Sequence, residues 1–147
     1  MSDEPEVHLT RRARFCAAHR LFRPDLTDAE NQGLFGKCAT PGGHGHNYIV
    51  DVTVAGPVDP ATGMVVDLKE IKRILHAEII DRWDHRDLNH DVPMLAGIQP
   101  TAENLAIAIW NALDGRVAGA RLVCVRLRET DNNRVDYFGP GKTGGRI

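Results

Sequence analysis

The sequence lacks the cysteine pattern of a disulfide-stapled protein or of a cysteine-rich zinc finger. Its three cysteines, Cys16, Cys38 and Cys124, are odd in number, and no two of them form a Cys-x-x-Cys pair. Cysteines without such pairing are typical of a reducing compartment. We therefore expect a cytoplasmic protein.

The sequence also lacks an excess of charge of one sign and a long apolar run. Its formal net charge is −2, which provides no basic surface for a nucleic-acid backbone. No apolar stretch reaches the length of a membrane span, and residues 1–6 carry acids where a secretory signal carries bases. These absences predict no nucleic-acid partner and no membrane association.

The length and composition predict one folded domain. The 147 residues are 42% hydrophobic and 26% charged, which is enough apolar content for a modest core. We expect residues 1–147 to form a single domain whose ends, 1–6 and 139–147, are flexible.

The spacing of apolar residues predicts an α+β fold. Apolar and polar residues alternate from Val7 to His19 and again from His44 to Val54, which is the period of a strand with one buried face. A long loop rich in glycine and proline is expected over residues 23–47. The elements expected after these are a short strand at 64–66, a helix that begins at Asp67, a helix capped by Thr101, and strands around 123–128 and 135–137.

Three histidines are the main candidates for metal ligands. His44 and His46 are two residues apart on one predicted strand, so both imidazoles lie on the same face. His19 falls on the matching face of the predicted neighbouring strand. Three neutral imidazoles leave one tetrahedral zinc position open, which is typical of a catalytic site. The alternative is that these are ordinary half-buried histidines.

Cys38 is the candidate for a reactive thiol, because it lies in the predicted loop, next to Lys37 and six residues before His44. A nearby cation and a metal ion would favour its thiolate form. The alternative is a small buried hydrophobic side chain.

Two further carboxylates mark possible chemistry. Asp84 and His85 are adjacent, which suits either a proton-transfer pair or a solvated helix end. Glu129 has the parity of Val125 and Leu127, so it carries a charge onto an apolar strand face. Its partner is expected to be either an arginine or a ligand that presents two parallel N–H donors.

Together, these motifs resemble the 6-pyruvoyl-tetrahydropterin synthase family. The resemblance runs from about Phe15 to Phe138. The residues that carry it are Phe15-Cys16-Ala17-Ala18-His19, Phe35-Gly36-Lys37-Cys38 followed by five residues and His44-Gly45-His46, Asp84-His85, and Glu129-Thr130-Asp131-Asn132-Asn133.

This resemblance implies a tunnelling fold. Its expected features are a four-stranded antiparallel sheet with two helices on one face, and subunits that close a barrel. The implied assembly is a homohexamer made from two trimers, with active sites between subunits.

The resemblance also implies roles for individual residues. His19, His44 and His46 bind Zn²⁺, Cys38 is the catalytic base, and Glu129 anchors the pterin ring. The pair Asp84 and His85 relays protons from a neighbouring subunit, and Thr101 lies near the pterin. The implied reaction converts 7,8-dihydroneopterin triphosphate to 6-pyruvoyl-tetrahydropterin and releases triphosphate.

Two alternatives remain open at this stage. A 6-carboxy-tetrahydropterin synthase uses the same substrate, and Pro100-Thr101-Ala102-Glu103 resembles that type more closely. The five-residue gap between Cys38 and His44 resembles the pyruvoyl type instead. The chain could also be a non-catalytic module that binds zinc or a pterin.

Overall fold

Two long strands form the centre of the structure, a computed structural model that describes residues 4–142. β1 (Glu6–His19) pairs antiparallel with β2 (His44–Pro57) along its whole length, from Glu6 opposite Pro57 to His19 opposite His44. β2 pairs with β4 (Arg121–Thr130), and β4 pairs with β5 (Asn133–Tyr137), both antiparallel. The predicted four-stranded antiparallel sheet is therefore confirmed.

A fifth, two-residue strand extends the sheet beyond the prediction. β3 (Arg86–Asp87) pairs parallel with Ala17 and Ala18 at the end of β1, which makes the strand order β3-β1-β2-β4-β5. Two residues are too few for a periodic pattern, so the sequence contains no signal for this strand.

The two faces of the sheet have different chemistry. Phe15, Tyr48 and Val50 are at most 3% exposed and form part of the core, as their alternation predicts. The opposite face carries a cross-strand row of alternating charge, in which Arg12 binds Asp51 at 2.8 Å and Arg126 binds Asp136 at 2.7 Å. The strands therefore have one buried and one polar face.

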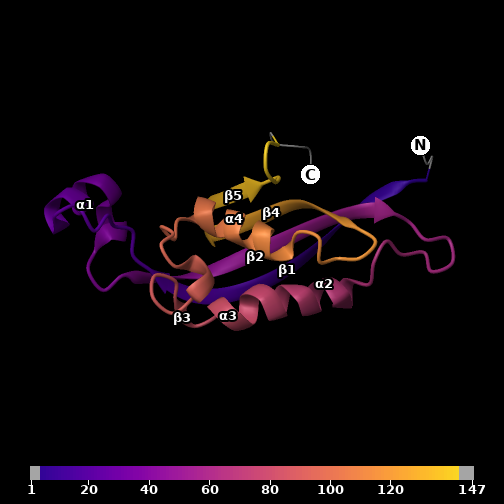
Figure 1. Ribbon diagram of the computed structural model, residues 1–147, viewed down its shortest axis with the longest axis horizontal. Helices are drawn as coiled ribbons and strands as arrows, with labels where there is room; N and C mark the ends of the chain where they lie inside the picture. Colours follow the sequence, from indigo (N-terminus) through magenta and orange to yellow (C-terminus); the bar gives the residue numbers. More distant parts are fainter. Residues whose placement is uncertain (1–3, 143–147) are drawn as a thin grey trace.

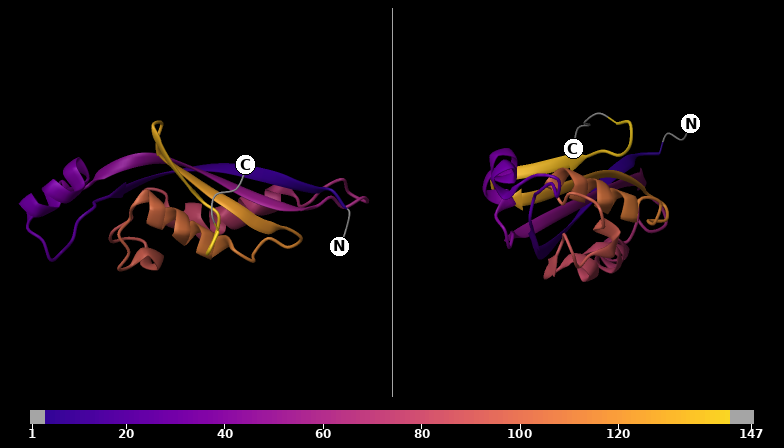
Figure 2. Two further views of the ribbon diagram at one scale, coloured as in Figure 1. Left: turned by 90° about the horizontal axis from the view of Figure 1, so that it is seen from above. Right: turned by 60° about the vertical axis from the view of Figure 1, so that its left-hand side comes forward.

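The predicted helices cover one face of the sheet (Figure 2). α2 (Leu68–Leu75) continues through the π-helix η2 (His76–Ile80) into α3 (Asp81–Trp83), and α4 (Ala102–Leu113) lies beside β4. Asp67 and Thr101 cap α2 and α4 by accepting the backbone N–H groups of Lys69 and Asn104. Their buried side chains include Ile71, Leu75, Ile79, Trp83, Leu105 and Ile109.

The prediction of a loop over residues 23–47 is wrong in its middle part. Helix α1 (Asp28–Phe35) and the 3₁₀ helix η1 (Gly36–Ala39) occupy it, and α1 lies at one end of the molecule (Figure 1). Thr27 and Glu30 form a reciprocal capping box at its start. Because Asn31 is the only buried residue of α1, the helix has no apolar stripe that could have predicted it.

The predicted strand at 64–66 does not form. These residues make a bend after a turn in which Gly63 donates its N–H to the carbonyl of Asp59. Val65 packs closely against Gly56 instead of pairing with a strand. The short 3₁₀ helix η3 (Pro93–Leu95) lies between β3 and α4.

Two residues within the expected flexible ends contact the folded part of the chain. Glu6 already pairs with Pro57, and Gly139 is buried so closely against Trp110 that an added Cβ would lie 2.5 Å from its ring. Of the expected tails, residues 1–3 and 143–147 lie outside the described residues. Within residues 4–142, no helix is long and apolar enough to cross a membrane.

Candidate metal centre and its surroundings

The register of β1 and β2 brings the three candidate histidines together. His19 lies opposite His44, and His46 lies opposite Ala17, so all three side chains meet at one end of the core face. The Nε2 atoms of His19 and His44 are 3.2 Å apart, and one possible ligand atom from each of the three residues lies within 4.8 Å of the others. A tetrahedral zinc ion with bonds of about 2.05 Å places its ligand nitrogens about 3.3 Å apart. The three rings therefore fit a metal site.

Burial favours the neutral, metal-binding form of His44 and His46. Desolvation lowers the pKa of His44, and nearby His19 lowers it further. Desolvation also lowers the pKa of His46, against the opposing effect of Glu129. His46 Nε2 is buried without a hydrogen-bond partner, and so is His44 Nδ1, although the His44 nitrogen that faces His19 is Nε2. A metal ion can bind the lone pair of a buried nitrogen that has no hydrogen-bond partner.

The second nitrogen of His19 has a fixed role. His19 is 1% exposed, and its Nδ1 lies 2.7 Å from the carbonyl oxygen of Pro100, an atom that can only accept. Nδ1 must therefore carry the proton, which leaves the lone pair on Nε2, toward His44. The hydroxyl of Tyr48 lies 3.5 Å from the same Nδ1. No sequence pattern predicts a functional role for Pro100 or Tyr48, although parity places Tyr48 on the face of His46.

Glu129 joins the histidines to a cavity large enough for a small molecule. Its Oε1 lies 3.7 Å from His46 Nε2, and its side chain is 18% exposed. The cavity beside it has a volume of 560 Å³, which is within the usual range for small-molecule sites. The other residues that line it include Leu21, Thr101, Asn133 and Arg134. Glu129 is thus half-buried between a possible metal centre and a ligand-sized space.

Thr101 lies at this cavity, but its hydroxyl has another partner. It accepts the N–H of Asn104 at 3.2 Å as the cap of α4. The adjacent Ala102 also lines the cavity. Thr101 thus places the start of α4 in the cavity wall. The residue before it, Pro100, contacts His19.

Cys38 is half-buried in η1, which is hydrogen-bonded to a residue of the cavity wall. Its backbone carbonyl accepts the N–H of Leu21 at 2.8 Å, and Leu21 lines the cavity of Glu129. Burial raises the pKa of Tyr48 well above its usual value, and the negative charges of Glu129 and then Cys38 raise it further. Cys38 is therefore close enough to Tyr48 to act on it electrostatically.

Asp84 and His85 lie apart from this group in the single chain. The Cys16 N–H donates to Asp84 Oδ1 at 2.8 Å, and the His85 N–H donates to the Cys16 carbonyl at 2.6 Å. That hydrogen bond from Cys16 holds the pKa of Asp84 below its usual value. Since Cys16 precedes His19 by three residues, the pair sits about 10 Å along the strand from His19. The His85 side chain is 78% exposed and 3.0 Å from Asp84.

Comparison with known proteins gives one consistent family. The family model for 6-pyruvoyl tetrahydropterin synthase matches residues 8–140. A 6-pyruvoyl tetrahydrobiopterin synthase from Pongo abelii is 47% identical over 134 residues, which cover 91% of this chain and 92% of the relative. The solved 6-pyruvoyl tetrahydropterin synthase of Caenorhabditis elegans is 39% identical, with a TM-score of 0.86 over 95% of this chain and 99% of that one.

A more distant relative represents the sister activity. A putative 6-carboxy-5,6,7,8-tetrahydropterin synthase from Archaeoglobus fulgidus is 35% identical over 86 residues, or 58% of this chain and 69% of the relative. Its similarity covers less of the chain and is lower than that of the pyruvoyl-type relative. The match of the family model across residues 8–140, the tunnelling fold and the identity to the orangutan and nematode proteins place this chain in the 6-pyruvoyl tetrahydropterin synthase family of lyases.

Proposed function

We propose that the protein uses Zn²⁺ to convert 7,8-dihydroneopterin triphosphate to 6-pyruvoyl-tetrahydropterin with release of triphosphate. The observation that carries this proposal is the meeting of His19, His44 and His46 beside a cavity of 560 Å³ that contains Glu129. The name of the orangutan relative, which matches over 91% of the chain, supports the pyruvoyl product. The three free cysteines support a reducing, cytoplasmic location.

Three imidazoles are a usual ligand set for catalytic zinc. The pKa values of His44 and His46 are lowered and the tautomer of His19 is fixed, so the three residues offer neutral nitrogens. Within residues 4–142, the metal-ligand cluster that contains them includes no carboxylate. Glu129 lies nearest, 3.7 Å from His46 Nε2. When bound, zinc would act as a Lewis acid toward the side-chain hydroxyls of the substrate and make the adjacent C–H bonds more acidic.

The protein's own groups would bind the pterin and move its protons. Glu129 would accept the two parallel N–H donors of the pterin ring through its carboxylate, because charge-assisted paired hydrogen bonds are strong and directional. Cys38 would take the proton from the side-chain carbon as a thiolate. Thr101 would contribute its part of the cavity wall. The side chain is oxidised while the ring is reduced, so the electrons stay within the substrate.

The separation of Asp84 and His85 from this centre favours an assembly in which a neighbour supplies them. Both ends of the sheet have free strand edges: β5 is the last strand, and β3 covers only Ala17 and Ala18 of β1. Exposed edges are stabilised when a sheet closes. We propose a homohexamer of two trimers, in which Asp84 and His85 of one subunit relay protons at the Cys38 of another.

The second candidate function is 6-carboxy-tetrahydropterin synthesis from the same substrate. Pro100-Thr101-Ala102-Glu103 favours it, because Ala102 stands at the cavity where a second threonine is expected in the pyruvoyl type. The five residues between Cys38 and His44 favour the pyruvoyl type instead. A non-catalytic module for zinc or a pterin is the alternative from outside the enzymes.

One experiment separates these functions. The purified, zinc-loaded protein is incubated with 7,8-dihydroneopterin triphosphate, and the pterin product and released triphosphate are identified by mass spectrometry. The expected result is 6-pyruvoyl-tetrahydropterin with one triphosphate for each product. A 6-carboxy product would favour the second function, and unchanged substrate with zinc fully bound would leave only the binding module.

A further inference from the structure

The segment that carries Cys38 is attached to the rest of the molecule at two adjacent residues. Leu21 donates its N–H to the Cys38 carbonyl at 2.8 Å, and Arg20 Nε donates to the Ala39 carbonyl at 2.9 Å. Ala39 is 2% exposed, although η1 belongs to neither the sheet nor the helical layer. The position of the Cys38 thiol therefore depends on where Arg20 and Leu21 lie.

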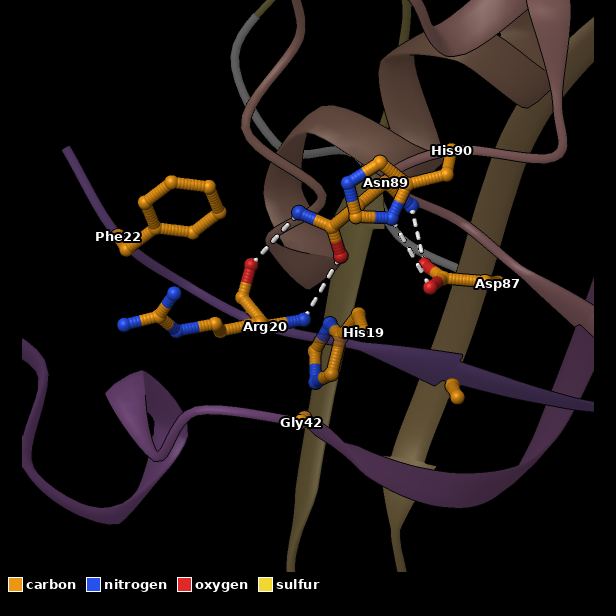
Figure 3. A pocket seen from close by; sticks show the side chains of 9 residues that line it. His19, Arg20, Phe22, Gly42, Asp87, Asn89 and His90 are labelled. Atoms are coloured by element: carbon orange, nitrogen blue, oxygen red, sulfur yellow. Dashed lines mark hydrogen bonds and ion pairs between the residues drawn. The ribbon is translucent and has the colours of Figure 1, made fainter. Parts of the chain in front are cut away.

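Residues 20–23 directly follow β1, and two side-chain amides take the place of a neighbouring strand. The Arg20 N–H donates to Asn89 Oδ1 at 2.7 Å, and Asn89 Nδ2 donates to the Arg20 carbonyl at 2.9 Å (Figure 3). Gln99 Nε2 donates to the Phe22 carbonyl at 2.8 Å, and Gln99 Oε1 accepts the Phe22 N–H at 3.4 Å. Each amide thus satisfies both backbone groups of one residue.

A third amide repeats this arrangement at the next residue. Asn31 is 2% exposed, accepts the Arg23 N–H at 2.7 Å and donates to the Arg23 carbonyl at 3.0 Å. At Leu21, between the clamped residues Arg20 and Phe22, the N–H goes to Cys38 instead. Alternation of partners along successive residues is the pattern of an extended strand. The chain after β1 is therefore held like a strand, with Asn89 and Gln99 along one edge and Cys38 and Asn31 along the other.

The first two clamps come from the loops that also hold the metal centre. Asn89 follows β3, and its neighbour Leu88 donates its N–H to the Ala18 carbonyl at 2.8 Å, directly before His19. Gln99 precedes Pro100, whose carbonyl orients His19. Asn89 and Gln99 therefore connect the Cys38 segment to the same two loops that contact the end of β1.

We infer that Asn89 and Gln99 are positioning residues that hold the Cys38 segment against the residues that directly follow His19, and this inference rests on the proposed role of Cys38 as the base. A displacement of about 1 Å at a reacting group can lower a rate about 10²-fold. The clamps lie outside the hydrophobic core, so their removal releases the segment and leaves the sheet and helices intact. Their loss should therefore lower kcat far more than it raises KM.

The test compares Asn89→Ala, Gln99→Ala and the matched control Asn111→Ala, an exposed amide on α4. Asn89→Asp is added because it keeps an acceptor for the Arg20 N–H but replaces the donor to the Arg20 carbonyl with a charged oxygen. Each variant is measured for zinc per chain, for kcat and KM with dihydroneopterin triphosphate, and for alkylation of Cys38 by iodoacetamide. The alkylation is followed in a Cys16→Ala background, because Cys16 is exposed whereas Cys124 is buried.

We expect each alanine clamp variant to lose about tenfold or more in kcat, with KM within about twofold and zinc content unchanged. Cys38 should react at least about threefold faster with iodoacetamide, because its segment opens more often. Asn89→Asp should fall between the wild type and Asn89→Ala in both measurements.

The two readouts distinguish failure of the inference from failure of the proposed function. If the wild type does not convert the substrate but the clamp variants still change Cys38 alkylation, the positioning role stands and the proposed reaction is wrong. Clamp variants that match Asn111→Ala in alkylation overturn the inference. A loss of zinc in parallel with kcat also overturns it, because the clamps would then support the metal centre and not the thiol.

Discussion

The metal ligands and the thiol of the candidate site are held by different kinds of structure. His19, His44 and His46 stand on two strands that pair along 14 residues each, so backbone hydrogen bonds fix their distances. Cys38 stands on a four-residue 3₁₀ helix that is hydrogen-bonded to Leu21 and Arg20, and the amides of Asn89 and Gln99 hold that neighbouring segment. The three histidines are thus supported by backbone pairing, whereas the segment of Cys38, the proposed base, depends on a few single hydrogen bonds.

The strongest test of this division removes the thiol and leaves the strands unchanged. Cys38→Ala should lower kcat about 10² to 10⁴-fold, which is the usual contribution of a general base. Zinc content should stay at the wild-type level, because Cys38 is not among the three clustered ligands. The measurements are steady-state turnover and metal analysis of the same sample. Cys38→Ser should be similarly slow, since a hydroxyl is far less acidic than a thiol; turnover at the wild-type rate in either variant would remove Cys38 from its role.

The converse test removes one ligand and leaves the thiol in place. Zinc sites with four protein ligands bind with about 10–16 kcal/mol, or roughly 3 kcal/mol for each ligand. His44→Ala should therefore weaken zinc binding about 10²-fold, as measured by competition with a chelator of known affinity. His8→Ala, an exposed histidine on β1, is the control and should bind zinc normally. Equal affinity of both variants would mean that the three histidines are not the metal site.

The grouping of the three histidines on one face could be predicted from the sequence, and the reason is geometric. A strand has a period of two residues, so the positions of His44 and His46 alone place both rings on one face. The alternation around Phe15 then predicts that His19 shares that face. The antiparallel register of β1 and β2, which the structure supplies, converts these faces into a cluster.

The hydrogen bonds that hold residues 20–23 could not be predicted in the same way. Asn89, Gln99 and Asn31 are polar residues in segments without periodicity, and their partners lie 69, 77 and 8 positions away in the sequence. No local rule states which backbone groups a side-chain amide will meet. Helix α1 was missed for a related reason, because only its capping box distinguishes it from a loop.

Amide hydrogen exchange measures the difference between the two supports directly. The N–H of Val50 belongs to a strand paired on both sides, whereas the N–H of Leu21 depends on a single hydrogen bond to Cys38. Local openings release weakly held segments at a lower free energy than central strands. We expect the Leu21 amide to exchange at least about tenfold faster than that of Val50 in the native protein. Equal protection would mean that the Cys38 segment opens only when the whole sheet does.

The smallest expected effect comes from removal of the Tyr48 hydroxyl, which lies near His19. Tyr48 is fully buried, and its hydroxyl lies 3.5 Å from His19 Nδ1, whereas the Pro100 carbonyl lies 2.7 Å from the same atom. A hydrogen bond at 3.5 Å is weak, and the proton of Nδ1 already has a better acceptor. Tyr48→Phe should therefore change the zinc affinity less than about fivefold, which corresponds to about 1 kcal/mol or less. A much larger loss, measured by the same chelator competition, would show that Tyr48 helps Pro100 to hold the His19 ring, and the strand pairing would then be insufficient to place the ligands.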